Sequence, residues 1–182
     1  MERVVAPLAQ VPDDELPLIG RDTEVQQLLP RLAPGARLAL VGAGGVGKSA
    51  VARELARRWS RGRARHAWWL DVEREEAIDT LVPRLLGALG VRRHGGDAAA
   101  ALQRALGRLG TALVVLDGAD HLPEAELLAL LDLPELTVLC TSRRRLDGWA
   151  SERLGALDAQ GAADLVRARA ALHGLPAPLG EG

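Results

Sequence analysis

The chain has 182 residues, of which 48% are hydrophobic and only 2% aromatic, and it contains neither Phe nor Tyr. This length is enough for one full domain and a fragment of a second, and the formal net charge of −1 gives no basic footprint for binding nucleic acid. The single cysteine, the lack of an apolar stretch near the ~20 residues of a membrane span and the lack of a signal-peptide pattern lead us to expect a soluble, cytoplasmic protein.

The first part of the chain leads up to a predicted helix and strand. Residues 1–17 are interrupted by prolines, and we interpret them as an N-terminal arm or linker. After Ile19-Gly20-Arg21, apolar residues at helical spacing predict a helix with Asp22 or Thr23 as its N-cap, which Pro30 kinks or ends. A turn at Pro34-Gly35 then leads into a predicted strand over residues 37–41.

The segment that follows this strand has the pattern of a phosphate-binding loop. Residues 42–49 fit G-x-x-x-x-G-K-[ST], with the strand before and the helix after that the motif requires. Backbone amides of such a loop cradle phosphates at the positive end of the helix dipole. The alternative is a glycine-rich turn that matches by chance. The candidate nucleotide-binding residues here are Gly42, Ala43, Gly44, Gly45, Val46, Gly47, Lys48, Ser49 and Ala50.

Lys48 is the only lysine among the 23 basic residues of the chain, all others being arginine. A compact ammonium group under two phosphates cannot be replaced by a planar guanidinium without a steric clash. We therefore expect Lys48 to contact the β- and γ-phosphates and the Ser49 hydroxyl to bind Mg²⁺.

The middle of the chain is interpreted mainly as scaffold. Residues 61–65 are rich in arginine but lack interleaved aromatic residues, which favours a solvated turn over a basic binding patch. Residues 67–70 predict a second strand that ends in Asp71. Apolar periodicity predicts a helix over residues 78–89 despite Pro83, and another that starts at residues 95–97.

The wholly apolar run of residues 112–116 predicts a central parallel strand that is buried on both faces. Asp117 follows it directly. An aspartate at the carboxyl end of such a strand is a candidate Mg²⁺ ligand, together with Ser49, in a phosphate-loop site. The alternative is an ordinary loop aspartate.

Two further residues are candidates for catalysis. Asp120 is the nearest carboxylate that could polarise an attacking water, or alternatively an N-cap for a helix over residues 122–131. A strand over residues 137–140 leads to Arg143, Arg144 and Arg145, of which Arg143 is the candidate sensor of the γ-phosphate. The other two arginines, and His121, are interpreted as surface or structural residues. The candidate catalytic set is Lys48, Asp117, Asp120 and Arg143.

The last predicted elements are a short strand over residues 153–157 and a helix that begins at Asp158 or Gln160 and runs to Leu172. Residues 173–182 are rich in Gly and Pro, and we expect a frayed tail. The expected domains are a linker (1–17), a nucleotide-binding domain (18–157) and the start of a helical lid with the tail (158–182).

Alternating strands and helices, with ligand groups at the carboxyl ends of the strands, predict an α/β fold with a parallel sheet between two helical layers, the three-layer sandwich of P-loop NTPases. The segments IGRD, LALVGAGGVGKSAVARELA, LVVLDGADHL, LTVLCTSRR and RLGALDAQGAADLVRARA resemble the nucleotide-binding domain of signal-transduction ATPases with numerous domains (STAND). The similarity is greatest to the NB-ARC branch and its bacterial regulator relatives, and it covers about residues 18–172.

This resemblance implies a five-stranded sheet of order 5-1-4-3-2 and an ATP/ADP switch. It also implies that Ile19 and Arg21 lie near the adenine and ribose, that Arg143 senses the γ-phosphate and that the ATP state self-associates through partner domains. One departure is Gly118, which stands where NB-ARC members often have a second acidic residue, so the water-activating residue is not identified. The helical and winged-helix subdomains of the family are expected to be mostly absent.

We therefore predict an ATP/ADP-binding switch with weak Mg²⁺-dependent ATP hydrolysis, in signal transduction or transcription regulation. Two alternatives stay open: a small-molecule kinase with Arg143, Arg144 and Arg145 as lid residues, and an assembly module that binds nucleotide without turnover. GTPases are disfavoured because their N-K-x-D motif needs a second lysine, and ABC-type ATPases because no LSGGQ-like stretch occurs.

Overall fold

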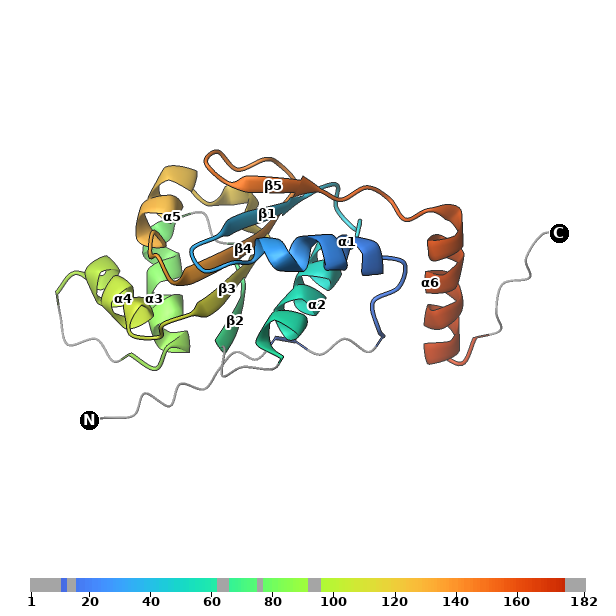
Figure 1. Ribbon diagram of the computed structural model, residues 1–182, viewed down its shortest axis with the longest axis horizontal. Coiled ribbons are helices and arrows are strands. Elements are labelled where there is room, and N and C mark those ends of the chain that lie inside the picture. The colour runs from blue at the N-terminus through green and yellow to red at the C-terminus, as the bar shows by residue number, and fades with distance from the viewer. Residues whose placement is uncertain (1–10, 13–15, 62–65, 75–76, 92–95, 176–182) are drawn as a thin grey trace.

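The computed structural model describes residues 11–12, 16–61, 66–74, 77–91 and 96–175. Its centre is a five-stranded sheet with the order β2-β3-β4-β1-β5, in which all neighbouring strands are parallel (Figure 1). This is the order 5-1-4-3-2 read from the other edge, so the predicted P-loop NTPase sandwich is confirmed.

The elements alternate along the chain. The strands are β1 (Arg37–Val41), β2 (His66–Asp71), β3 (Ala112–Asp117), β4 (Leu136–Ser142) and β5 (Ala150–Arg153). The α-helices are α1 (Asp22–Leu28), α2 (Lys48–Ser60), α3 (Ile78–Ala88), α4 (Ala98–Gly107), α5 (Glu124–Leu130) and α6 (Ala159–Leu172). Two short 3-10 helices, Leu29–Arg31 and Ala119–His121, follow α1 and β3.

The central strand β3 is apolar from Ala112 to Leu116 because both faces of the sheet are covered there. Successive residues point to opposite faces, and in β3 Val114 and Leu116 belong to one buried cluster, whereas Leu113 and Val115 belong to the other. The first cluster includes residues of α3, α4 and α5, and the second includes residues of α1 and α2. The core is therefore two layers of aliphatic side chains with the sheet between them.

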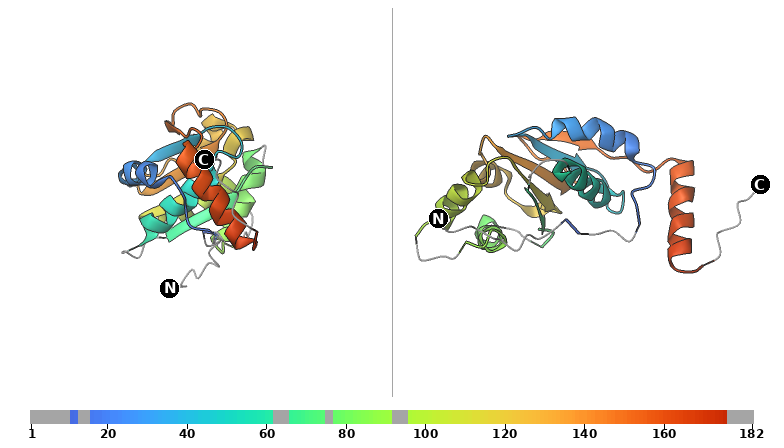
Figure 2. Two further views of the ribbon diagram at one scale, coloured as in Figure 1. Left: turned by 90° about the vertical axis from the view of Figure 1, so that its right-hand side faces the viewer. Right: turned by 60° about the horizontal axis from the view of Figure 1, so that its bottom comes forward.

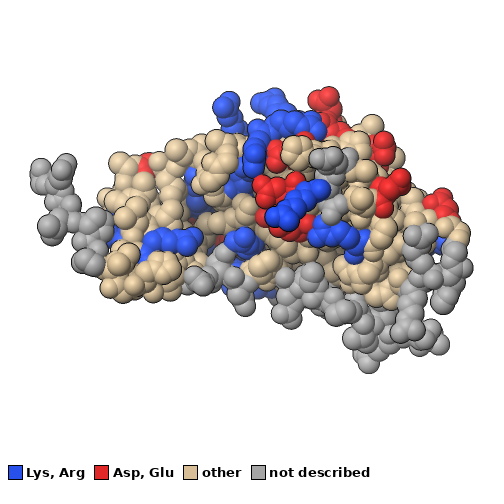
Figure 3. Space-filling model, turned by 180° about the vertical axis from the view of Figure 1, so that it is seen from behind, with Lys and Arg blue, Asp and Glu red and all other residues tan. Residues whose placement is uncertain are grey.

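Helix α6 stands apart from these layers, at the end of the molecule (Figures 1 and 2). Gly161 is its one buried residue, and Val166 and Leu172 are exposed. Within the described part of the chain, no helix is both long and apolar enough to cross a membrane. Acidic and basic side chains lie next to one another on the face seen in Figure 3, where the charge is mixed.

Most predicted elements are confirmed within a residue or two, including the helix that continues through Pro83 and the one that starts after Asp97. The Asp97 carboxylate accepts hydrogen bonds from the amides of Ala99 and Ala100, as an N-cap does. Most of the expected arm (1–17) and tail (173–182), and residues 62–65 of the arginine-rich turn, lie outside the described residues.

Two predictions about element ends are wrong. The last strand is not residues 153–157 but Ala150–Arg153, because the amide of Leu154 makes the final bond to β1, 2.8 Å from the carbonyl oxygen of Val41, and the chain then leaves the sheet. The N-cap of α1 is Arg21 rather than Asp22 or Thr23, and no side chain caps it. Asp22 is instead paired with Arg58 of α2, 3.0 Å away.

Candidate nucleotide-binding site

The carboxyl ends of β1, β3 and β4 meet at one edge of the sheet, and the loop between β1 and α2 lies there. The loop begins against neighbouring backbone: the amide of Gly42 donates to the carbonyl of Ser142 at 3.1 Å. A Cβ at position 42 would lie 2.6 Å from the carbonyl oxygen of Leu154, so the first glycine of the motif is required by close approach of two chain segments.

Lys48 is the first residue of α2 and turns back over the loop. Its Nζ donates to the carbonyl oxygens of Gly42 and Ala43, each at 2.9 Å. The pKa of Lys48 is lowered from its ordinary value, chiefly because partial burial disfavours the charged form. The nearby charges of Asp120 and Asp117 act in the opposite direction, and that of Arg143 lowers the pKa further. The ammonium group is thus held over the phosphate loop, within the electrostatic influence of the other candidate catalytic residues.

Ser49 and Asp117 are brought into direct contact. The Ser49 hydroxyl donates to Asp117 Oδ1 at 2.8 Å, and the Thr141 hydroxyl donates to the same oxygen at 2.5 Å. The Thr141 oxygen in turn accepts from the amide of Gly118 at 2.8 Å. Two hydroxyl groups therefore orient the Asp117 carboxylate toward the start of α2.

Asp120 lies in the 3-10 helix after β3, and it does not cap the following helix. Helix α5 begins at Glu124 with Pro123 as its N-cap, so the N-cap interpretation is wrong. Asp120 Oδ1 accepts from the backbone amide of Arg143 and from the Ser142 hydroxyl, the latter at 3.3 Å. This carboxylate therefore fixes the end of β4.

The three consecutive arginines have different surroundings. Arg143 Nη2 is 3.1 Å from Glu73 Oε1. Arg144 pairs with Glu124 and donates through Nε to the carbonyl of Asp120 at 2.8 Å. Arg145 lines a separate hollow of about 270 Å³ whose other residues include Arg143 and Arg153. Only Arg143 of the three reaches the cavity that holds Lys48 and Asp117.

That cavity has a volume of about 160 Å³ and is mostly polar. It is lined by Gly44, Gly45, Lys48, Ser49, Asp71, Glu73, Asp117, Gly118, Asp120, Thr141 and Arg143. All four candidate catalytic residues lie together here. Asp71 and Glu73 were not predicted; the one available signal was that Asp71 ends a strand, and the register pairs it with Asp117 across β2 and β3.

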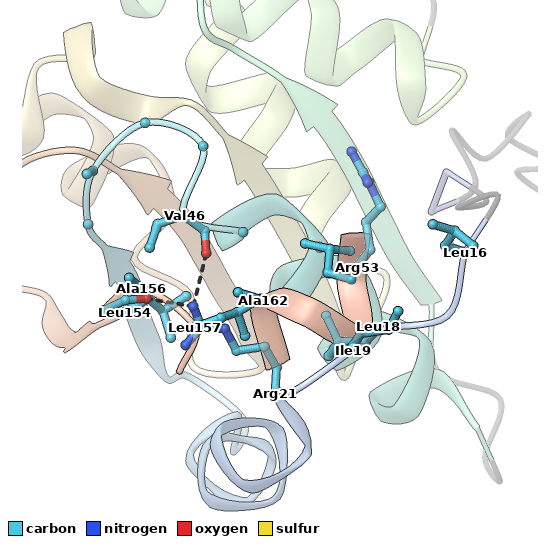
Figure 4. A pocket seen from close by; sticks show the side chains of 18 of the residues that line it. Leu16, Leu18, Ile19, Arg21, Val46, Arg53, Leu154, Ala156, Leu157 and Ala162 are labelled. Carbon is cyan, nitrogen blue, oxygen red and sulfur yellow. Dashed lines mark hydrogen bonds between the residues drawn. The ribbon is translucent and has the colours of Figure 1, made fainter. Parts of the chain in front are cut away.

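A second, larger cavity of about 970 Å³ also borders the phosphate loop (Figure 4). Its walls come from residues 16–19 and Arg21, the phosphate loop, the segment after β5 and helix α6. Arg21 is 5% exposed and donates to the carbonyl oxygens of Val46 at 3.1 Å and Gly155 at 2.6 Å (Figure 4). It ties the loop to the segment that follows β5.

Gly44 and Gly45 line both cavities. A ligand made of a large organic group and a chain of phosphates could therefore occupy both cavities. Its organic group would lie among Ile19, Arg21 and Leu157, and its terminal phosphate would lie beside Lys48 and Asp117. The volume of the larger cavity is in the range usual for small-molecule sites.

Comparison with known proteins identifies the family of the chain. A family model described as an AAA domain matches residues 35–146, from the turn before β1 to the loop after β4. The chain belongs to this family and is an AAA-type P-loop ATPase domain. No match to a curated protein is found by sequence.

Several solved structures share the fold. They include Cdc6p from Pyrobaculum aerophilum, with a TM-score of 0.67 and 19% identity over 92% of this chain. Two proteins from Aeropyrum pernix are also similar: ORC2, solved in ADPNP and ADP complexes (0.65, 15%, 92% of this chain), and ORC1 in complex with DNA (0.62, 21%, 94% of this chain). The chain spans 52%, 56% and 55% of these three structures, respectively.

Proposed function

We propose that the chain is an ATP/ADP-binding switch domain with slow, Mg²⁺-dependent ATP hydrolysis, acting in signal transduction or transcription regulation as STAND proteins of the NB-ARC type do. The observation that carries the proposal is the convergence of Lys48 of α2, Asp117 of β3 and Arg143 after β4 on one small cavity that adjoins the phosphate loop. The AAA-domain match supports the class of enzyme, and the motifs around the loop support the finer assignment.

The residues at this edge fit Mg²⁺. The Ser49 hydroxyl and the Asp117 carboxylate are oxygen donors 2.8 Å apart, and oxygen donors are what Mg²⁺ prefers. Among the described residues, no group of three or more His, Cys, Asp or Glu could hold a metal. Water and nucleotide phosphate oxygens would therefore supply the remaining Mg²⁺ ligands. Bound Mg²⁺ would neutralise phosphate charge, while Lys48 and the loop amides would position the phosphates.

Arg143 gives the site its means of distinguishing ATP from ADP. A side chain aimed at the γ-phosphate has differential affinity for one nucleotide, and only differential affinity can drive a switch. Arg143 is 61% exposed and lies on a loop whose next residue, Arg144, is fixed by Glu124. The Arg143 side chain can therefore swing while its backbone stays in place.

The kinase alternative gains no support, because Arg144 is already bound to Glu124 and to the carbonyl of Asp120 and is not free to act as a lid residue. The expectation that the chain binds no nucleic acid is also unsupported, since the similar ORC1 structure is a complex with DNA. We propose that the ligands of the site are nucleotide and Mg²⁺. We also propose that the ATP state self-associates through partner domains.

The proposal is tested by two measurements on the purified chain. Calorimetry with ATP and with ADP, each with and without Mg²⁺, should show binding of both. Phosphate release at enzyme excess should be slow and Mg²⁺-dependent, and independent of added small-molecule acceptors. Binding without any phosphate release would favour the assembly module, and stimulation by an acceptor would favour a kinase.

A further inference from the structure

Gly118 directly follows Asp117, at the position where NB-ARC proteins often have a second acidic residue. The structure gives the reason for the glycine. Its φ is +84°, and a Cβ there would lie 2.9 Å from both Cα and Cβ of Glu73. Such contacts are not tolerated by real Cβ atoms, so no side chain fits at position 118. The space beside the end of β3 is taken by Glu73, which itself carries a carboxylate.

The position of Glu73 is set by the end of β3. The amide of Val72 donates to the carbonyl of Asp117 at 2.8 Å, and Val72 is fully buried. The amide of Glu73 donates to the side chain of Asp71 at 3.1 Å. Asp71 and Val72, which precede Glu73, are therefore anchored to β3 and the core. They hold Glu73 at the rim of the cavity that contains Lys48, Ser49 and Asp117.

Three other carboxylates line this cavity, but each already has a structural partner. Asp117 Oδ1 accepts from Ser49 and Thr141, and Asp120 Oδ1 accepts from the amide of Arg143 and from Ser142. Asp71 accepts from the amide of Glu73. Among the described residues, the Glu73 carboxylate has one hydrogen-bond partner, the exposed side chain of Arg143.

The geometry points to Glu73 as the carboxylate that activates water for ATP hydrolysis, with Arg143 holding it until a γ-phosphate binds. This inference rests on the proposed function. The water oxygen forms a bond to the γ-phosphorus, while the bond from that phosphorus to the bridging oxygen breaks and its electron pair leaves with ADP. The water proton passes to the Glu73 carboxylate and then to solvent, so the carboxylate is regenerated.

The pair of Glu73 and Arg143 is suited to this exchange. Both side chains are 61% exposed, and ion pairs that exposed are weak because water screens them. A γ-phosphate can therefore draw Arg143 away from Glu73 at little cost. The residue that detects ATP is then also the residue that releases the water-activating carboxylate, which links nucleotide recognition to turnover.

The inference is tested with Glu73→Gln and with Glu152→Gln as the matched control. Glu152 is also an exposed glutamate paired with an arginine, Arg31 at 2.7 Å, but it lines neither cavity. Single-turnover ATP hydrolysis and the affinities for ATP and ADP are measured for each full-length variant, with its unfolding temperature. Asp120→Asn is measured in parallel, because Asp120 is the competing candidate.

We expect Glu73→Gln to slow hydrolysis about 100-fold or more, the contribution typical of general-base catalysis. ATP affinity should rise by up to about fivefold with ADP affinity unchanged, because Arg143 no longer has a competing partner. Glu152→Gln should match the wild type. Unchanged hydrolysis in Glu73→Gln, or a 100-fold loss in Asp120→Asn alone, would overturn the role of Glu73 while leaving the proposed function intact. Wild-type protein that binds ATP but never hydrolyses it would overturn both.

Discussion

Ser49 Oγ lies 2.8 Å from Asp117 Oδ1, although the two residues are 68 positions apart in the sequence. One sits in the first turn of α2 and the other at the carboxyl end of β3, and the parallel sheet brings these ends to the same edge. Their contact joins the phosphate loop to the strand that supplies the carboxylate, and it places two oxygen donors where one Mg²⁺ could bind both.

Asp117→Asn should keep most of the nucleotide affinity and lose Mg²⁺-dependent hydrolysis, because the change removes the charge that attracts the metal and leaves the loop amides and Lys48 in place. ATP affinity with and without Mg²⁺, and phosphate release, are the measurements. Asp132→Asn is the control, since Asp132 is 73% exposed and pairs with Arg37 away from both cavities. Hydrolysis as fast as in wild type would refute the metal role.

Lys48→Ala should weaken binding of ATP and ADP by about 100-fold or more, because a charge-assisted contact to phosphate is lost from a partly buried site. Lys48→Arg should fail to restore binding, since the planar guanidinium cannot take the place of an ammonium group that sits between the carbonyls of Gly42 and Ala43. Calorimetry with both nucleotides measures the effect. Tight binding by Lys48→Ala would reject the phosphate site, and tight binding by Lys48→Arg would contradict the need for a compact ammonium group.

Arg143→Ala should reduce the preference for ATP over ADP by about tenfold, in the range of a charged contact to one phosphate. ADP affinity should hardly change. Arg145→Ala is the control, because Arg145 belongs to the same loop but does not line the cavity with Lys48 and Asp117. If both nucleotides were weakened equally, Arg143 would be a general phosphate contact and not a sensor.

Gly118→Ala should lower the free energy of unfolding by about 1–3 kcal/mol, because the new Cβ meets the backbone of Glu73 and the residue has a φ of +84°. Gly107→Ala is the matched control: Gly107 lies at the end of α4 and a Cβ there contacts nothing within 4 Å. That control should be neutral or slightly stabilising. Denaturant unfolding measures both, and equal stability of the two variants would contradict the close approach of Glu73.

Cys140 is fully buried in β4, and burial raises the pKa of its thiol well above the ordinary value of about 9.0. The folded thiol should therefore resist alkylation, which should proceed only as the protein unfolds. Above pH 9 the thiol ionises in the unfolded state but not in the folded state. The free energy of unfolding of the wild type should therefore fall, relative to that of Cys140→Ala, by at most about 1.4 kcal/mol per pH unit. Rapid alkylation under native conditions would contradict this burial.

Much of the fold could be predicted because the pattern that determines it is local. The apolar run of residues 112–116 indicates a strand covered on both faces, and the motif of residues 42–49 requires a strand before and a helix after it. The helix that starts at residues 95–97 was predicted from apolar residues that recur at helical spacing within one segment. These features depend on neighbouring residues, and the sequence displays them directly.

The phosphate loop and the candidate set of Lys48, Ser49, Asp117 and Arg143 could be predicted from the residues alone, and the order of the sheet from the family resemblance. Three contacts became visible in the fold: Asp120 fixes the end of β4, Arg144 is bound to Glu124, and Glu73 fills the space beside Gly118. These contacts join residues that are far apart along the chain. Residues 73 and 118 meet because β2 and β3 are adjacent and in register, and no pattern within either segment records that contact.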